Sequence, residues 1–156
     1  MKVTIFPSDC VTGTLKAPPA KSMAHRALIC AGLAEGTSVI GNIAASEDIL
    51  ATMDCLRALG AEIDFDPEKM RAEVKGVDPS ARAEAVMNCR ESGSTLRFMI
   101  PICALSEQAA ELNGKGRLMQ RPLKIYEDIF DSQGIAFERS DASITVKGSL
   151  KITFPK

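Results

Sequence analysis

The sequence predicts a mixed α/β fold, of the α+β kind, built from two tandem βαβαββ modules. Apolar residues recur at helical spacing in some stretches and alternate in others, and the order of these stretches repeats once along the chain. The Val-Lys-Gly tripeptide at 74–76 returns at 146–148, about 70 residues later. The other recurring markers are Arg26 with Arg97 and Gly60 with Gly134. An internal duplication of this kind decides the architecture before any single motif does.

The duplication also sets the expected domain organisation. We expect residues 1–156 to form one partial domain, with the first module over about residues 14–80 and the second over about residues 82–156. Hydrophobic residues make up 46% of the chain and charged residues 25%, which is ordinary for a globular protein. The chain is therefore long enough to bury a substantial core.

The first module is expected to open with short strands, followed by a helix. The strands would contain Val3, Ile5, Val11 and Leu15. Pro18 and Pro19 hold the chain extended, and Ser22 is expected to cap a mostly apolar helix over about residues 22–34. Gly36 suits the position just beyond the end of this helix.

The rest of the first module is expected to be a strand, a helix and a hairpin. Residues 37–42 are rich in strand-forming side chains, and Ser46 with two following acids opens a helix that ends at Gly60. Two alternating stretches, 61–65 and 71–77, form the hairpin.

The second module repeats this order. Ser94 or Thr95 is expected to cap a buried helix that runs to residue 105 and keeps Pro101 inside it, because the repeat demands a helix there. The remaining expected elements are a strand at 110–114, a helix at 122–132 that ends at Gly134, and a hairpin of 135–138 with 143–148.

Composition excludes several classes of function. The net charge of −1, the absence of Trp and the single Tyr argue against nucleic acid as a partner. The five cysteines are odd in number and contain no CxxC pair, so neither a disulfide framework nor a metal site is expected. Cys30, Cys55 and Cys103 lie in apolar helical patterns, as small hydrophobic residues. With no apolar run of membrane-spanning length and no signal peptide, we expect a cytoplasmic protein.

Three basic clusters nevertheless predict a local anion site. Lys21, Ser22 and Arg26 surround the positive end of the first helix, and Arg26 can point back by one turn toward that end. Such charges are often merely solvated, but the second module repeats the arrangement with Gly93, Ser94 and Arg97. The third cluster is the glycine-containing loop at 113–122, which includes Lys115, Arg117 and Arg121.

Two further residues keep two interpretations each. Asp48 either contacts a ligand or serves only the helix dipole, and Glu91 either orients Arg26 or Arg97 or is an exposed loop acid. His25, the only histidine, is expected to pack beside the first helix turn and not to act as a base. The residues alone predict a protein that binds a small, multiply anionic ligand, with no cofactor motif and no obvious proton-transfer pair.

The order and spacing of these motifs resemble the 3-phosphoshikimate 1-carboxyvinyltransferases, or EPSP synthases, over essentially the whole chain. The motifs are Lys21-Ser22-x-x-x-Arg26, Gly93-Ser94-Thr95-x-Arg97 and Asn113-Gly114-x-Gly116-Arg117-x-x-x-Arg121-Pro122. The resemblance implies an inside-out α/β barrel of six modules in two domains, with helix N-termini facing the cleft between them. This chain would then be an N-terminal fragment that lacks the C-terminal modules, and in the family the first strand, here residues 1 to about 14, belongs with the other domain.

The resemblance also implies roles for individual residues. Lys21 would be the catalytic residue, between shikimate 3-phosphate and phosphoenolpyruvate, and Ser22 and Arg26 would hold shikimate 3-phosphate. Gly93 would line the phosphoenolpyruvate pocket, where glyphosate also binds, and Arg117 would bind the phosphate of phosphoenolpyruvate. Ser94 and Arg97 would lie close to that pocket, and Glu91 stands where the family often has Asn.

The activity implied is transfer of the enolpyruvyl group of phosphoenolpyruvate to the 5-hydroxyl of shikimate 3-phosphate, in aromatic amino acid biosynthesis, without a cofactor. Because residues of the second domain are missing, we expect the chain alone to be inactive. One alternative is a fragment of a UDP-N-acetylglucosamine enolpyruvyl transferase, although that family carries Lys-Asn in place of Lys21-Ser22. The other is a non-catalytic βαβαββ module that binds anions or RNA.

Overall fold

The computed structural model describes residues 2–7, 10, 12–15 and 17–151. It contains four α-helices, seven strands and two short 3₁₀ turns within these ranges. In chain order they are α1 (Lys21–Gly32), β1 (Thr37–Gly41), α2 (Glu47–Ala58), β2 (Glu62–Asp66), β3 (Arg71–Lys75), η1 (Pro79–Ala81), β4 (Ala85–Asn88), α3 (Gly93–Cys103), β5 (Ala110–Asn113), η2 (Leu118–Gln120), α4 (Lys124–Gln133), β6 (Ala136–Arg139) and β7 (Ser143–Lys147).

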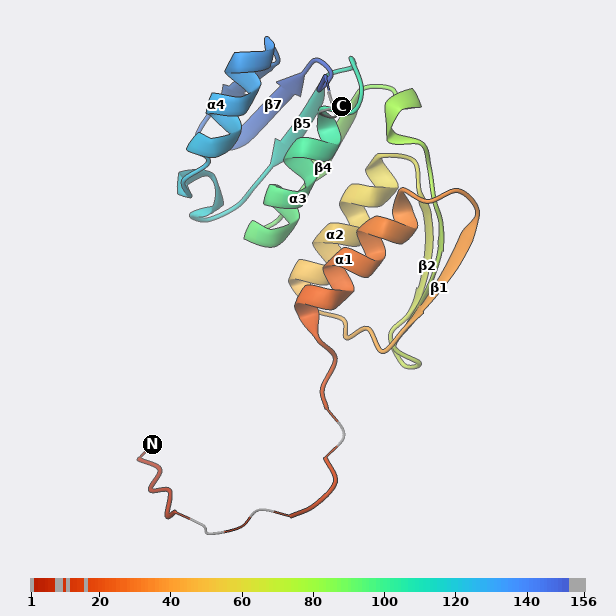
Figure 1. Ribbon diagram of the computed structural model, residues 1–156, viewed down its shortest axis with the longest axis vertical. Helices are drawn as coiled ribbons and strands as arrows, with labels where there is room; N and C mark the ends of the chain where they lie inside the picture. Colours follow the sequence, from red (N-terminus) through yellow and green to blue (C-terminus); the bar gives the residue numbers. More distant parts are fainter. Residues whose placement is uncertain (1, 8–9, 11, 16, 152–156) are drawn as a thin grey trace, which may run out of the picture.

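The elements form two sheets with helices between them (Figure 1). The first sheet has the order β1-β3-β2 and is wholly antiparallel, and the second has the order β4-β5-β7-β6. In the second sheet β4 pairs parallel with β5, and the other two pairings are antiparallel. Helices α1 and α2 lie between the first sheet and α3, which packs on the second sheet. The mixed α/β fold expected from the sequence is confirmed.

The two modules share one topology. The second module is a complete βαβαββ unit from β4 to β7, and α1 to β3 reproduce its last five elements in the same order. By this correspondence β1 occupies the place of β5, and the neighbour that would match β4 is absent among the described residues. The duplication read from the sequence is thus visible in both sheets.

The strands expected before the first helix do not form in the described residues. Val3, Ile5 and Leu15 are exposed, in a segment that extends away from the body (Figure 1), while Val11 lies outside the described residues. A strand is stable only when its backbone groups pair with a neighbour, and no described strand lies beside this segment. This prediction was therefore wrong for the described part of the segment.

A continuous apolar core links the two modules. Leu28 of α1, Leu56 of α2 and Met99 of α3 are fully buried, as are Val74 and Val146 at matching positions of β3 and β7. Contacts between α2 and α3, and between α2 and β4, carry this core across the module boundary. The two copies therefore pack as one body, as a shared hydrophobic core requires.

Two predicted helix caps were wrong by a few residues. Helix α1 begins at Lys21, so Ser22 lies inside its first turn, and the N-cap residue Ala20 makes no side-chain hydrogen bond. Helix α3 is capped by Ser92, whose Oγ accepts from the backbone N–H of Thr95 across 3.2 Å, and not by Ser94 or Thr95. In both helices the extended backbone before the first turn ends earlier than expected, so the N-cap position precedes the residue chosen for its N-cap propensity. Helix α1 also ends at Gly32, so Gly36 does not directly follow its end as expected.

Other details of the helices agree with the sequence, apart from one cysteine. Ser46 Oγ caps α2 by accepting from Ile49 N–H at 3.3 Å, and α3 contains Pro101 as expected. Gly134 ends α4 with a φ of 68°, a left-handed value that glycine adopts readily. Cys30 is exposed, whereas Cys55 and Cys103 are buried, because Cys30 lies on the solvent side of α1.

Candidate functional site

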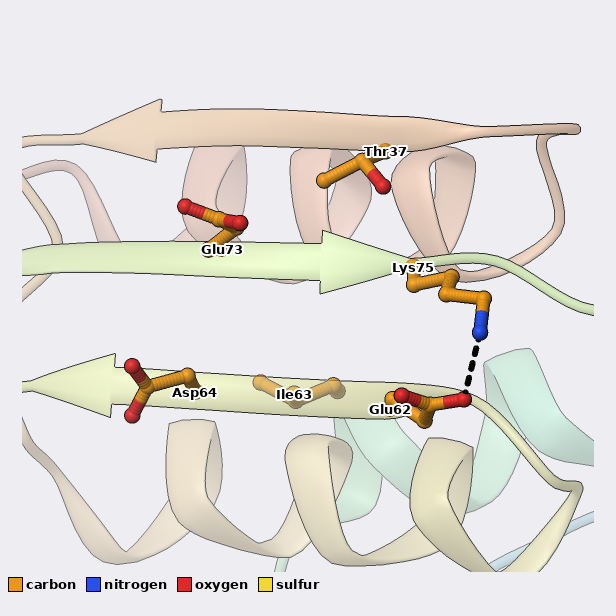
Figure 2. Close-up of a pocket in the computed structure, with 6 residues that line it drawn as sticks. All are labelled: Thr37, Glu62, Ile63, Asp64, Glu73 and Lys75. Atoms are coloured by element: carbon orange, nitrogen blue, oxygen red, sulfur yellow. Dashed lines mark hydrogen bonds and ion pairs between the residues drawn. The ribbon is translucent and has the colours of Figure 1, made fainter.

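A shallow pocket of about 340 Å³ lies on the outer face of the three-stranded sheet (Figure 2). Its one cation, Lys75, is paired with Glu62 across 2.7 Å. The excess of carboxylates makes it unsuitable for an anionic ligand. The lining residues are Thr37, Glu62, Ile63, Asp64, Glu73 and Lys75.

A larger pocket, of about 610 Å³, has the opposite character. Three of its side chains are cationic, and seven of the nine residues that line it belong to the three basic clusters found in the sequence. This pocket contains most of the candidate site residues taken from the sequence. The lining residues are Lys21, Asp48, Glu91, Gly93, Ser94, Gly116, Arg117, Leu118 and Arg121.

Three helices begin at this pocket. Figure 1 shows α1, α2 and α3 running in the same general direction, so that their N-termini gather at one end. Lys21 and Gly93 are the first residues of α1 and α3, and Asp48 lies in the first turn of α2. The unpaired N–H groups and dipoles of three helices therefore add positive potential where the basic side chains gather.

Lys21 and Asp48 form an ion pair at the wall of the pocket. Lys21 Nζ lies 2.6 Å from Asp48 Oδ2. The hydrogen bond from Lys21 is the main cause that lowers the pKa of Asp48, and burial opposes it. Asp48 is therefore ionised at neutral pH, and its carboxylate fixes the Lys21 ammonium in place. Asp48 thus lies at the pocket wall and also occupies the first turn of α2, where its charge suits the helix dipole.

Gly93 is what allows two arginines to approach the start of α3. A Cβ atom at Gly93 would collide with Arg121 Nη1 and would lie 3.3 Å from Arg97 Nη1. Arg117 lines the same pocket from the loop that follows β5. Arginine side chains at this spacing suit phosphate or carboxylate groups, which their planar guanidinium groups can bind with two hydrogen bonds.

Arg121, expected only as a member of the basic loop at 113–122, is a candidate ligand-binding residue in its own right. The carbonyl oxygen of Arg121 accepts a hydrogen bond of 2.8 Å from Arg139 Nη2, which also donates to the carbonyl of Met119. These bonds tie the η2 loop to β6 and place Arg121 over Gly93. The available signal was its position four residues after Arg117, immediately before Pro122.

Ser22 and Arg26 do not line this pocket. Arg26 Nη1 donates to the carbonyl oxygen of Ser22 across 2.8 Å, and its guanidinium carbon lies 5.4 Å from the ring centre of Phe98. Arg26 thus points back toward the helix start as expected, but packs over an aromatic ring. Ser22 and Arg26 remain beside Lys21 on the first two turns of α1.

Glu91 lies in the turn before α3, beside the basic loop at 113–122. A Cβ atom at Gly116 would collide with Glu91 Oε1, so the carboxylate lies directly against the backbone of that glycine. Gly116 has a φ of 59°, which is a second reason for glycine there. Within the described residues, no hydrogen bond or ion pair joins Glu91 to Arg26 or Arg97. Glu91 is exposed, which agrees with its interpretation as a loop acid.

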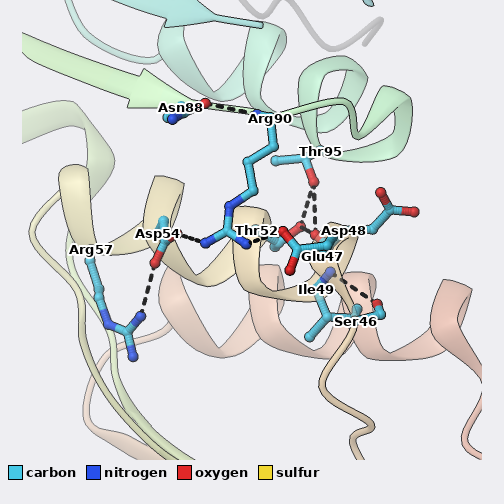
Figure 3. Close-up of polar contacts among 10 residues, drawn as sticks. All are labelled: Ser46, Glu47, Asp48, Ile49, Thr52, Asp54, Arg57, Asn88, Arg90 and Thr95. Atoms are coloured by element: carbon cyan, nitrogen blue, oxygen red, sulfur yellow. Dashed lines mark hydrogen bonds and ion pairs between the residues drawn. The ribbon is translucent and has the colours of Figure 1, made fainter. Parts of the chain in front are cut away.

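Arg90 joins the two modules beside the pocket, as Figure 3 shows. Its guanidinium donates to Glu47 Oε2 at 2.6 Å and to Asp54 Oδ2 at 2.7 Å, both on α2. The backbone of Arg90 has a φ of 51°, and its N–H donates to Asn88 Oδ1 at 2.9 Å. This turn sets the direction in which the chain enters α3, and the sequence analysis did not anticipate it.

Two kinds of feature are absent from the described part of the chain. No group of three or more His, Cys, Asp or Glu residues there could hold a metal ion. No helix there has the length and apolarity needed to cross a bilayer.

Comparison with known proteins was informative. The sequence profile of the family described as EPSP synthase (3-phosphoshikimate 1-carboxyvinyltransferase) matches residues 5–153. A relative of that name from Clostridium perfringens strain SM101 is 44% identical over 152 residues, which cover 96% of this chain and 35% of the relative. A relative of the same name from Clostridium beijerinckii is 42% identical over 156 residues, with 94% and 35% covered. The chain thus spans about a third of the length of these relatives.

A solved structure shares the fold. An EPSP synthase from Acinetobacter baumannii superposes with a TM-score of 0.76 at 22% identity, covering 87% of this chain and 32% of that one. The likeness establishes that this chain has part of the α/β fold of that protein. The family match over nearly the whole sequence goes further, and it shows that the chain belongs to the EPSP synthase family.

Proposed function

We propose that this chain supplies part of the active site for transfer of the enolpyruvyl group from phosphoenolpyruvate to the 5-hydroxyl of shikimate 3-phosphate, a step of aromatic amino acid biosynthesis. Membership of the EPSP synthase family supports the reaction. The observation that carries the proposal for this chain is the pocket with Lys21, Arg117 and Arg121 at the shared N-terminal end of three helices.

Both proposed substrates are anions, which suits this pocket. Lys21 is the proposed catalytic residue and lies between them, and Arg117 and Arg121 bind the phosphate and carboxylate of phosphoenolpyruvate at the Gly93 side. In the reaction, the methylene carbon of phosphoenolpyruvate gains a proton and becomes a methyl group, while the 5-hydroxyl oxygen adds to the neighbouring carbon and loses its proton. Phosphate then leaves as the methyl group gives up a proton, which restores the carbon–carbon double bond. The cations reduce the repulsion between the two anions and stabilise the charge on the departing phosphate.

The remaining residues have secondary places in the proposal. Ser22 and Arg26 bind shikimate 3-phosphate from the exposed side of α1, next to Lys21. Ser94 and Arg97 lie at the edge of the phosphoenolpyruvate site, where Arg97 is close to Gly93. The module bounds of about 14–80 and about 82–156 are part of the same proposal.

We also propose that modules other than the two described here complete the active site, because the chain spans 35% of the length of its relatives. The chain alone is therefore expected to release no phosphate from the two substrates. We also propose a cytoplasmic location. We propose no nucleic-acid partner, because the net charge of −1 gives no general attraction for nucleic acid. Retention of the chain on immobilised nucleic acid at low salt would contradict the absence of a nucleic-acid partner.

Calorimetric titration tests the proposed site. The chain is titrated separately with phosphoenolpyruvate and with shikimate 3-phosphate, beside the variants Arg117→Ala and Arg121→Ala. We expect weak binding of phosphoenolpyruvate that each variant reduces by about tenfold or more, because a charged hydrogen bond is lost. Arg71→Ala is the matched control, since Arg71 is an exposed arginine of β3 that does not line the pocket.

Two outcomes would contradict the proposal. Equal affinity for phosphoenolpyruvate in Arg117→Ala, Arg121→Ala and the wild type would remove the arginines from the site. The absence of heat at millimolar concentrations of either substrate would show that this chain holds no preformed site.

A further inference from the structure

A chain of buried polar side chains crosses three helices beneath the pocket. His25 of α1, Thr52 of α2, and Ser92 and Thr95 at the start of α3 are each at most 1% exposed. His25 Nδ1 lies 2.7 Å from Thr52 Oγ1, which lies 2.8 Å from Thr95 Oγ1. Thr95 Oγ1 in turn lies 2.7 Å from Ser92 Oγ. We call these four residues the His25–Ser92 chain.

The hydrogen bonds of the His25–Ser92 chain can all be donated in one direction, from His25 toward Ser92. The three short contacts use one proton each if His25 donates to Thr52, Thr52 to Thr95 and Thr95 to Ser92. The proton of Ser92 is then left for a further acceptor. Ser92 is also among the groups that lower the pKa of Asp48, after the larger contribution of Lys21.

The second ring nitrogen of His25 favours this direction. His25 Nε2 is buried and has no hydrogen-bond partner among the described residues. If the chain ran the other way, Nδ1 would accept from Thr52 and Nε2 would carry a buried, unpaired N–H. With the proton on Nδ1, Nε2 presents only a lone pair, and proteins tolerate an unpaired acceptor better than an unpaired donor. The network therefore assigns the Nδ1–H tautomer to neutral His25.

The His25–Ser92 chain contacts Asp48, which lines the functional pocket. Thr95 Oγ1 also lies 3.2 Å from the backbone oxygen of Asp48, and Figure 3 shows Thr95 pointing from α3 toward α2 at this place. The Asp48 carboxylate is held on its other side by Lys21 Nζ at 2.6 Å. Asp48 and Lys21 both line the pocket, whereas the His25–Ser92 chain lies behind them.

We propose that the His25–Ser92 chain positions the Asp48 carboxylate and, through it, the Lys21 ammonium at the pocket wall. This inference rests on the proposed function, because it concerns the pair that faces the anionic substrates there. With Thr95 Oγ1 against its backbone oxygen and Lys21 Nζ on its carboxylate, Asp48 has little freedom to move, so the ammonium is placed before a ligand arrives. The four residues are buried away from the ligand and act through Asp48.

The first test uses the wild-type chain. His25 is the only histidine, so its two ring nitrogens give unambiguous NMR signals in a ¹⁵N-labelled sample. At about pH 7.5 we expect the proton on Nδ1 and an unprotonated Nε2. A proton on Nε2 would reverse the chain and overturn the proposal.

The second test removes one hydroxyl from the middle of the chain. Thr95→Val keeps the shape of the side chain but breaks the path to Ser92, and Thr95→Ser keeps the hydroxyl. We expect Thr95→Val to raise the pKa of Asp48, followed by ¹³C NMR, toward its usual value and to weaken binding of phosphoenolpyruvate about threefold to tenfold. Thr95→Ser should restore both quantities. Ser106→Ala is the matched control, because Ser106 is a buried serine outside the chain.

The outcomes separate a positioning role from a structural one and from the proposed function. A lower melting temperature of Thr95→Val with an unchanged pKa of Asp48 would overturn the proposal. If Thr95→Val does not fold, Thr52→Val takes its place, because it interrupts the His25–Ser92 chain one hydroxyl earlier. The pKa of Asp48 and the affinity for phosphoenolpyruvate are then measured in Thr52→Val. If the wild type binds neither substrate, the proposed function fails. The pKa of Asp48 in the variants still decides whether the His25–Ser92 chain positions Asp48.

Discussion

The hydroxyl of Tyr126 in α4 donates a hydrogen bond to the backbone oxygen of Arg97 in α3, across 3.1 Å. This carbonyl would normally accept from the N–H of residue 101, which is proline and has none. The side chain from a neighbouring helix thus satisfies the group that the proline leaves free. Because Arg97 lies close to Gly93, the bond also stabilises one side of the proposed site.

A double-mutant cycle tests this relationship. Tyr126→Phe is expected to lower the free energy of unfolding by about 1 kcal/mol, the usual contribution of such a bond. In the Pro101→Ala background the helix supplies its own donor, so the same change should cost clearly less. Chemical denaturation of the four proteins measures the coupling. Equal costs in both backgrounds would show that the two residues act independently.

Gly93→Ala is expected to damage the site without harming the fold. The added Cβ collides with the end of the flexible Arg121 side chain, which can move away, while alanine suits the first turn of a helix. We expect affinity for phosphoenolpyruvate to fall by about tenfold with little change in melting temperature. Gly41→Ala, where a Cβ meets nothing within 4 Å, is the control for both measurements. Unchanged affinity would mean that Arg121 does not bind the ligand.

Gly76→Ala is expected to destabilise the fold itself. Here the added Cβ collides with the backbone oxygen of Ala34 and lies 2.6 Å from that of Ala31, and neither can move without shifting the end of α1. Overpacking against backbone should lower the free energy of unfolding by about 3 kcal/mol in urea denaturation, against about 0.5 kcal/mol or less for Gly41→Ala. Similar losses in the two variants would contradict this account.

Arg82→Lys tests a buried arginine that the sequence analysis did not single out. Arg82 is 6% exposed and ties the segment before β4 to the end of α3 and the loop before β5. A lysine cannot reproduce the fork of donors, so we expect a loss of about 3 kcal/mol. The exposed Arg71→Lys should change stability little, and an equally small effect at Arg82 would refute its clamping role. The four acceptors are the carbonyl oxygens of Ala83, Cys103, Gln108 and Ala109.

Acid should destabilise the chain through His25. Burial is the main cause that lowers the pKa of His25 below its usual 6.5, with Asp48 opposing it. Above about pH 7.5 the histidine is neutral in both states and contributes no pH dependence. As pH falls below that value the unfolded chain gains a proton that the folded chain resists, so stability declines. We expect a loss of up to about 1.4 kcal/mol between about pH 7.5 and about pH 5.5. His25→Asn should abolish most of that slope in urea denaturation.

The architecture was predictable because the spacing of apolar residues indicates each helix and strand, and the same order of helices and strands occurs twice. The tripeptide at 74–76 and 146–148 lies at the end of the last strand of each copy, yet its glycines serve different purposes. Gly76 makes room for the backbone of α1, whereas Gly148 has a φ of 123°. A repeated residue thus predicts a repeated place in the topology, and its physical reason depends on tertiary neighbours.

The parts that were missed depend on contacts between distant segments. The cap of α3 could have been any of Ser92, Ser94 or Thr95, and the choice follows from the turn that Arg90 fixes by reaching α2. Arg121 enters the pocket because a bond from Arg139, in β6, folds the loop back. The strands expected near the N-terminus needed a neighbouring strand, which spacing along one segment cannot supply.

The pocket has one wall in each copy of the duplicated unit, with Lys21 and Asp48 on one side and Arg117 and Arg121 on the other. A ligand that touches both walls binds only while the copies are packed together. Occupancy is therefore thermodynamically linked to that packing, and a ligand at 100 times its Kd adds about 2.7 kcal/mol to the stability of the joined pair. Neither copy alone gains this energy, so a saturated chain unfolds as one cooperative unit.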